Sequence, residues 1–173
     1  MIATCSPLHT RQETALRQIR DFAARIPVLR TLGFRLTDVQ RGFVVFEGQV
    51  TEGLTQNGIL HGGVLAAILD TACAAAAISV DFPDSYAITV GLQVSYLRSI
   101  KQGTFRAEGQ CLKSGKTLLF SEASVRDSTG ELLATASSQL IRIAPPELQH
   151  GSTQVNSKQM EECYANAGNI CSG

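Results

Sequence analysis

The segment from Asn57 to Ala77 restricts the possible folds of this chain more than any other. It reads NGILHGGVLAAILDTACAAAA, rich in alanine and leucine, with Asp70 as its one carboxylate. Beyond the glycines it has the length and composition of a helix that is apolar on nearly every side. A helix without a polar face has to be covered on most sides. We therefore expect a central buried helix around which the rest of the chain is wrapped.

The sequence on either side of this helix alternates with a period of two, which is typical of antiparallel strands with one buried face. Two strands are expected between residues 32 and 51, around a turn at Arg41-Gly42. Four more are expected at residues 88–98, 104–112, 116–126 and 131–143. In the first of these four, Thr89 alternates with the run Ile88, Val90, Leu92, Val94 and Tyr96. The pattern predicts an α+β fold, a curved antiparallel sheet wrapped around a long central helix.

Three regions are expected along the chain. Residues 1–31 contain an amphipathic helix that begins with a capping box at Thr10 and Glu13, stops before Pro27, and packs on the rim of the sheet. Residues 32–144 form the domain itself. Residues 145–173 follow a double proline and are polar, so we expect a disordered or weakly held tail.

Composition limits the partners. Only 17% of the residues are charged, against roughly 25% in soluble domains, so we expect an oligomer. The formal net charge is zero, and with no basic cluster we expect no nucleic-acid partner. Five cysteines without a CxxC spacing argue against a disulfide framework and favour a reducing cytoplasm. The three histidines are far apart, so no metal site is expected.

Two other stretches resemble known motifs without matching them. The apolar stretch 62–80 could suggest a membrane span, but the carboxylate in its middle and the strands around it favour a core helix, so no membrane contact is expected. The letters KSGKT at 113–117 suggest a phosphate loop. The spacing from Gly109 to Gly115 is one residue too long, and a strand-turn-strand context indicates a hairpin instead.

Asp70 is the candidate for chemistry. Its sequence neighbours are Ile68, Leu69, Ala72 and Cys73, so an ordinary surface position is a poor explanation. Burying a carboxylate without a partner is costly, and it has to be solvated, paired or used. At the start of the same helix, the amides of Gly62 and Gly63 are available to an electronegative ligand atom. An acid and an oxygen-binding helix end together suggest chemistry on a carbonyl.

The distance between these groups predicts a dimer. Gly62 and Asp70 are eight residues apart, which is about 12 Å along a helix. Both groups need to come within about 3 Å of one carbonyl, and a single helix cannot achieve this. Two such helices packed antiparallel across a two-fold axis can, with the amide from one chain and the acid from the other.

The helix start HGGVLAAILDTA resembles the PaaI-like branch of the hotdog-fold acyl-CoA thioesterases. The downstream stretches VSYLRSIKQG and CLKSGKTLLFSEASVRDSTGELLATASS resemble it as well. The likeness covers residues 32–143. It implies a hotdog fold, dimers often paired into tetramers, and hydrolysis of a thioester to an acid and coenzyme A. Coenzyme A enters as part of the substrate, and no cofactor is expected.

The resemblance also implies residue roles. Asp70 would be the general base or nucleophile, and the Gly62 amide would polarise the thioester carbonyl from the neighbouring subunit. His61 would hold the thioester end, Asn57 would orient the acid or the attacking water, and Thr89 would help to position that water. Many relatives carry the asparagine six residues before the histidine, whereas Asn57 is four before it. Gln56 is the other candidate for this role.

For binding the substrate, the resemblance points to the glycine after Gly62 and to strand ends. The residues expected to contact the thioester or coenzyme A are Gly63, Arg98, Lys113, Ser114, Gly115 and Lys116. Two alternatives stay open at this point. One is a dehydratase or hydratase of acyl thioesters on the same fold, and the other is a non-catalytic acyl-CoA binding protein. The acyl group is not specified by the sequence.

Overall fold

The computed structural model describes residues 7–144, with side chains from residue 13 onward. The expected C-terminal tail lies outside the described residues. The helices are α1 (Pro7–Ala23), α2 (Pro27–Thr31) and α3 (Gly62–Ile78), with a short 3₁₀ turn at Glu52–Leu54. The strands are β1 (Phe34–Gln40), β2 (Phe43–Gln49), β3 (Thr55–Gln56), β4 (Ile59–Leu60), β5 (Tyr86–Tyr96), β6 (Thr104–Ser114), β7 (Leu118–Asp127) and β8 (Leu132–Ile143).

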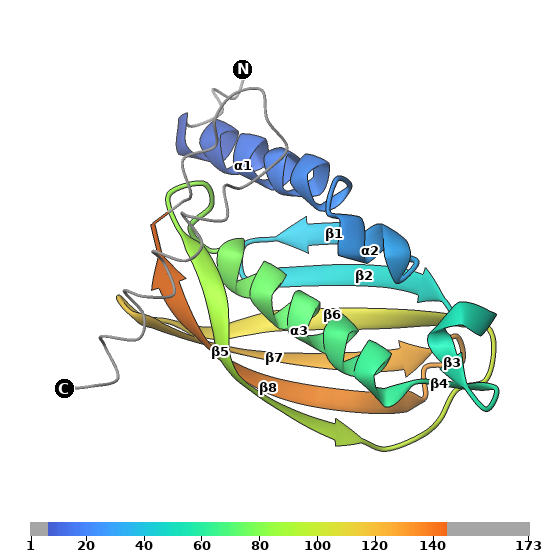
Figure 1. Cartoon of the computed structure of the whole chain (residues 1–173). Coiled ribbons are helices and arrows are strands. Elements are labelled where there is room, and N and C mark those ends of the chain that lie inside the picture. Colours follow the sequence, from blue (N-terminus) through green and yellow to red (C-terminus); the bar gives the residue numbers. More distant parts are fainter. Residues whose placement is uncertain (1–6, 145–173) are drawn as a thin grey trace.

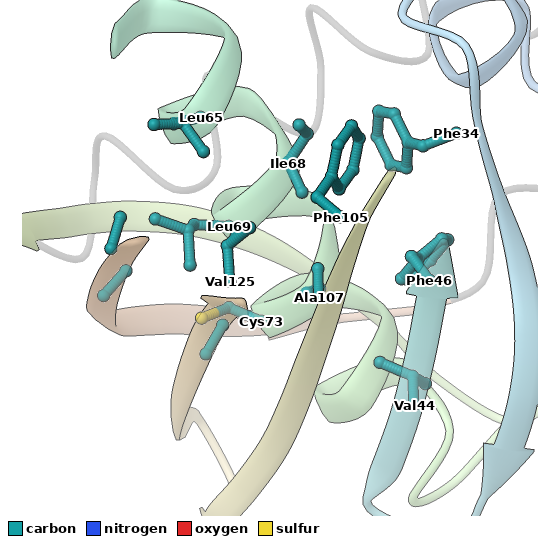
Figure 2. Close-up of a cluster of buried hydrophobic side chains, with 14 of the residues drawn as sticks. Phe34, Val44, Phe46, Leu65, Ile68, Leu69, Cys73, Phe105, Ala107 and Val125 are labelled. Atoms are coloured by element: carbon teal, nitrogen blue, oxygen red, sulfur yellow. The ribbon is translucent and has the colours of Figure 1, made fainter. Parts of the chain in front are cut away.

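Six strands form one antiparallel sheet in the order β1-β2-β6-β7-β8-β5, and α3 lies across its inner face (Figure 1). This is the expected hotdog arrangement, and the six strands and the central helix are confirmed. The core fills the space between α3 and the sheet. Figure 2 shows its largest cluster, in which Leu65, Ile68 and Leu69 of the helix meet side chains of β2, β6 and β7.

The helix lies very close to the sheet at Gly109 of β6. A Cβ atom built on this glycine would lie 2.2 Å from the backbone carbonyl oxygen of Ala72. No side chain fits in that space, so glycine is required for α3 to lie this deep. The close contact places the middle of the helix directly against the centre of the sheet.

The two edges of the sheet differ in what covers them. At one edge, β1 packs against α1 and α2, and Arg20 of α1 pairs with Asp38 of β1 at 3.3 Å. At the other edge, β5 has eleven residues, and no strand of the described chain pairs with its outer side. Val90 and Tyr96 on β5 are each 54% exposed. A long, partly apolar edge of this kind is suited to pairing with another chain.

A β-bulge at Val90 changes the faces expected for β5. Thr89 pairs with Leu140 and Gly91 with Gln139, so Val90 is an extra residue without a partner on β8. Strict alternation puts Thr89 on the face opposite Leu92, Val94 and Tyr96, and this expectation is wrong. The extra residue shifts the register by one. Thr89 therefore shares the inner face with those three residues and points toward α3.

The N-terminal helix is present, but it begins earlier than expected. It starts at Pro7 and not after a cap at Thr10, ends at Ala23, and is followed by the separate α2 from Pro27. Proline suits the first turn of a helix because its φ is preset and its missing N–H has no helical partner there. The capping-box interpretation of Thr10 and Glu13 is therefore wrong.

One hairpin was not expected. β3 and β4 pair across a two-residue turn, with φ of +53° at Asn57 and +72° at Gly58. Asn-Gly is the preferred pair for such a turn because both residues must adopt positive φ. From the sequence alone, this pair belongs to the stretch that leads into the helix. The turn gives the asparagine at this position a structural reason, whatever else it does.

Candidate active site

The start of α3 is built from three consecutive residues. His61 is the N-cap, with φ −65° and ψ 136°, and its Nδ1 accepts a hydrogen bond of 2.9 Å from the N–H of Gly63. Because Nδ1 accepts, the proton of the neutral ring is on Nε2. Both glycine amides were expected to be available to a ligand, but the Gly63 amide is already engaged. The Gly62 N–H has no acceptor among the described residues.

Asp70 lies in the middle of α3 and is half-buried. Its Oδ1 accepts a hydrogen bond of 2.8 Å from Thr89 Oγ1 on β5. None of the ion pairs found among residues 13–144 includes Asp70. The carboxylate is thus oriented by a neutral donor and not neutralised by a cation. A carboxylate in this state is free to accept a proton or to attack an electrophile.

The helix face that carries Asp70 is only partly covered by the sheet. Its half-buried residues are small: Ala66, Ala67, Thr71, Ala74 and Ala75. The opposite face of the helix supplies buried residues to the core, among them Ile68, Leu69, Ala72, Cys73 and Ala76. A second body, either a ligand or another chain, can therefore approach the backbone of α3 closely on the Asp70 side.

Within one protomer the acid and the amide stay apart. They are on the same straight element, eight residues from one another, so about 12 Å separates them. A hollow of about 580 Å³ lies elsewhere, on the outer face of the sheet, and is lined by residues such as Glu108, Glu122 and Gln93. That hollow includes neither Asp70 nor Gly62.

The two residues considered for orienting water lie at the surface. Asn57 and Gln56 are both exposed, Asn57 at the turn and Gln56 on β3. Thr89, by contrast, is in direct contact with Asp70. The structure therefore brings Thr89 and Asp70 together and leaves Asn57 and Gln56 at the tip of the small hairpin.

The residues expected to hold coenzyme A fall into two groups. Arg98 bonds through its backbone to Leu133 and pairs with Glu131 at 2.8 Å. The hairpin 113–118 lies instead at the far end of β8, where the backbone N–H of Arg142 donates to the carbonyl oxygen of Thr117. Residues 133 and 142 are nine apart on one strand, or roughly 30 Å. One protomer cannot use both groups on the same small ligand.

The hairpin is held by a residue that sequence reasoning missed. The guanidinium of Arg142 donates to the hydroxyl of Ser114, to the Gly115 carbonyl at 3.2 Å and to the carboxylate of Asp81. Lys113 and Lys116 are exposed beside this network. The only sequence signal for Arg142 was a charged residue near the end of an apolar strand.

Cys73 packs in the core and takes no visible part in the site. It is fully buried, and burial, followed by the charges of Asp70 and Glu122, raises the pKa of its thiol to about 12. A thiol with such a pKa stays protonated at neutral pH and is a poor nucleophile. The interpretation of Cys73 as a small packing residue agrees with this environment.

Comparison with known proteins identifies the family. A model of the thioesterase superfamily matches residues 57–134. A thioesterase family protein from Silicibacter pomeroyi, known from its crystal structure, is 32% identical to this chain, with a TM-score of 0.68. The match covers 74% of this chain and 97% of that protein. The chain belongs to the thioesterase superfamily. Membership in this family implies hydrolysis of a thioester.

More distant structures share the fold. The PaaI protein of E. coli, from its phenylacetic acid degradation operon, superposes with a TM-score of 0.71 at 21% identity, covering 78% of this chain and 96% of that one. A Haemophilus influenzae thioesterase gives 0.68 at 18% identity, covering 79% and 94%. The expected likeness to PaaI-like hotdog proteins is confirmed. In the described residues, no helix of this thioesterase is long and apolar enough to cross a membrane.

Proposed function

We propose that this chain is an acyl-CoA thioesterase that acts as a homodimer, each site combining Asp70 of one subunit with the Gly62 amide of the other. One observation carries the proposal. Asp70 is half-buried on the partly covered face of α3, is oriented by Thr89, and pairs with no cation among residues 13–144. An acid in this state, on a helix whose first amide is open, matches what the hydrolysis of an activated carbonyl needs.

The reaction can be written with these groups alone. Asp70 takes a proton from a water molecule, whose oxygen attacks the thioester carbonyl carbon, or its carboxylate attacks directly and water releases the acid from the resulting anhydride. In either case the carbonyl oxygen becomes an oxyanion that accepts from the Gly62 N–H. The carbon–sulfur bond then breaks, and the thiolate of coenzyme A leaves and takes up a proton. The thioester is a good enough electrophile that no cofactor is called for.

The uncovered edge of β5 supports the dimer. Pairing of this edge with its copy would be isologous, with the same residues on both sides of a two-fold axis. It would also bring two α3 helices together in antiparallel directions across their small-residue faces. The start of one helix would then lie beside the middle of the other, which shortens the 12 Å separation that one chain imposes.

The same symmetry explains the division of the residues expected to hold coenzyme A. Antiparallel helices put the hairpin with Lys113 and Lys116 of one subunit on the side where the other subunit has Gly62 and Arg98. We propose that coenzyme A lies across this boundary, with basic groups from both chains near its phosphates. His61 then acts at the thioester end, and the Gly63 amide holds its ring.

The first experiment is release of free thiol from a panel of aromatic and aliphatic acyl-CoA thioesters, with wild type and Asp70→Asn compared. We expect hydrolysis by the wild type and a loss of at least about a hundredfold in the variant, as is usual for a general base. A folded Asp70→Asn protein with full activity would refute the proposed mechanism. A wild type that binds the panel but hydrolyses none of it would favour the acyl-CoA binding or dehydratase alternative.

A mixing experiment tests the composite site. Gly62→Pro removes the amide hydrogen and little else, because proline is tolerated at the first helical position and the preceding ψ of 136° suits it. Gly62→Ala is the matched control, since its Cβ would meet Tyr96 at an ordinary 3.5 Å. Co-expressed Asp70→Asn and Gly62→Pro chains should recover about a quarter of wild-type activity, because half of the random dimers carry one intact site. If mixing the two variants restored no activity, Asp70 and the Gly62 amide of each site would come from the same chain.

A further inference from the structure

The peptide that joins Gly62 to Gly63 is held from both sides. Its N–H donates to His61 Nδ1 at 2.9 Å, and its carbonyl oxygen accepts from the hydroxyl of Tyr96 at 3.1 Å. The ring of Tyr96 also lies against the glycine: a Cβ on Gly62 would be 3.5 Å from the ring. A glycine has the freest backbone of any residue. These contacts restrict the backbone rotation of Gly62.

The neighbouring peptide, between His61 and Gly62, carries the open N–H. Its direction depends on the same backbone torsions that the two hydrogen bonds restrict. An oxyanion donor is effective only when it already points at the position of the developing charge. We propose that Tyr96 is a positioning residue for the reaction, which aims the Gly62 amide by holding the Gly62 carbonyl. This inference rests on the proposed function of Gly62.

Tyr96 is on the same strand, β5, as Thr89, so one strand contacts both Gly62 and Asp70. β5 runs antiparallel to α3, from Tyr86 near the end of the helix to Tyr96 at its start. Along β5, Thr89 bonds to Asp70 and Tyr96 bonds to Gly62. Both side chains are on the inner face because of the bulge at Val90. The same edge strand thus orients the acid and the amide, and the proposed dimer pairs along that strand.

The test is Tyr96→Phe, with Tyr86→Phe as a matched control. The first change removes a hydroxyl that donates to Gly62 and keeps the ring. The second removes a buried hydroxyl at the other end of the same strand, which has no hydrogen-bond partner within the described part of the chain. We expect Tyr96→Phe to lower kcat about tenfold with KM little changed, less than the 10²–10³ lost when such a donor is removed outright. Tyr86→Phe should leave kcat unchanged.

A second readout does not depend on hydrolysis. The Gly63 amide is the one bonded to His61 Nδ1. Its hydrogen exchange should accelerate in Tyr96→Phe and stay at the wild-type rate in Tyr86→Phe, with the dimer and Tm unaltered. Wild-type exchange together with a kcat within twofold of wild type would overturn the role of Tyr96. So would an effect confined to KM. If no thioester is hydrolysed by the wild type but exchange still accelerates, the proposed function fails and the positioning contact stands.

Discussion

Thr89 Oγ1 and Asp70 Oδ1 are joined by a hydrogen bond of 2.8 Å that ties the edge strand β5 to the middle of α3. The bond exists because Val90 is an extra residue in the strand. It gives the half-buried carboxylate a donor without cancelling its charge. The orientation of the candidate acid therefore depends on the edge of the sheet.

Thr89→Val should reduce turnover while the protein stays folded. Valine keeps the shape of the side chain and removes the donor, and a hydrogen bond to a charged group contributes roughly 1.5–3 kcal/mol. We expect kcat to fall at least about tenfold. Thr89→Ser retains the hydroxyl and should stay near wild type. Steady-state hydrolysis of the best thioester of the panel measures this, and equal rates for valine and serine would contradict it.

Val90→Lys should weaken the proposed dimer. Val90 is 54% exposed on the unpaired edge, and a lysine there opposes edge-to-edge pairing. The dissociation constant should rise about tenfold or more, with activity lost on dilution. Val28→Lys is the control, because Val28 is 50% exposed on α2, away from this edge. Analytical ultracentrifugation over a dilution series distinguishes them, and an unchanged Val90→Lys dimer would exclude β5 as the interface.

Gly109→Ala should destabilise the fold. The new methyl group would lie 2.2 Å from the carbonyl oxygen of Ala72, so α3 or β6 has to move. Overpacking of this kind lowers the free energy of unfolding by about 1–3 kcal/mol. Gly53→Ala meets nothing within 4 Å and should stay within about 0.5 kcal/mol of wild type. Urea denaturation measures both, and equal midpoints would show that the helix does not lie this close to the sheet.

Cys73 should resist alkylation in the folded protein. Its pKa is raised to about 12 by burial, with smaller contributions from the charges of Asp70 and Glu122. Below that pH the protonated thiol persists, and only the thiolate reacts. At pH 8, iodoacetamide should therefore modify Cys73 only after unfolding in urea, when the pKa returns to its ordinary range. Peptide mass spectrometry reports the site, and rapid labelling of native protein would contradict the buried position.

Much of the fold could be predicted from local pattern. The period-two segments predicted the six strands of the sheet, and the continuous apolar run predicted a central helix, since burial of side chains dictates both. The acid in that helix could be found because it interrupts an apolar run, and the two glycines because they stand directly before that run. The Asn57-Gly58 hairpin was missed although its signal was present, because the pair was interpreted with the helix that follows.

The chain by itself determined the elements, the apolar helix and the candidate acid, because these follow from the spacing of side chains along a regular backbone. The tertiary structure decided which groups meet. A single extra residue at Val90 put Thr89 on the side of Asp70, and alternation along the strand does not reveal a bulge. The contact of Tyr96 with Gly62 joins residues 34 positions apart. Such pairings depend on how strand and helix pack, and only the folded chain sets that geometry.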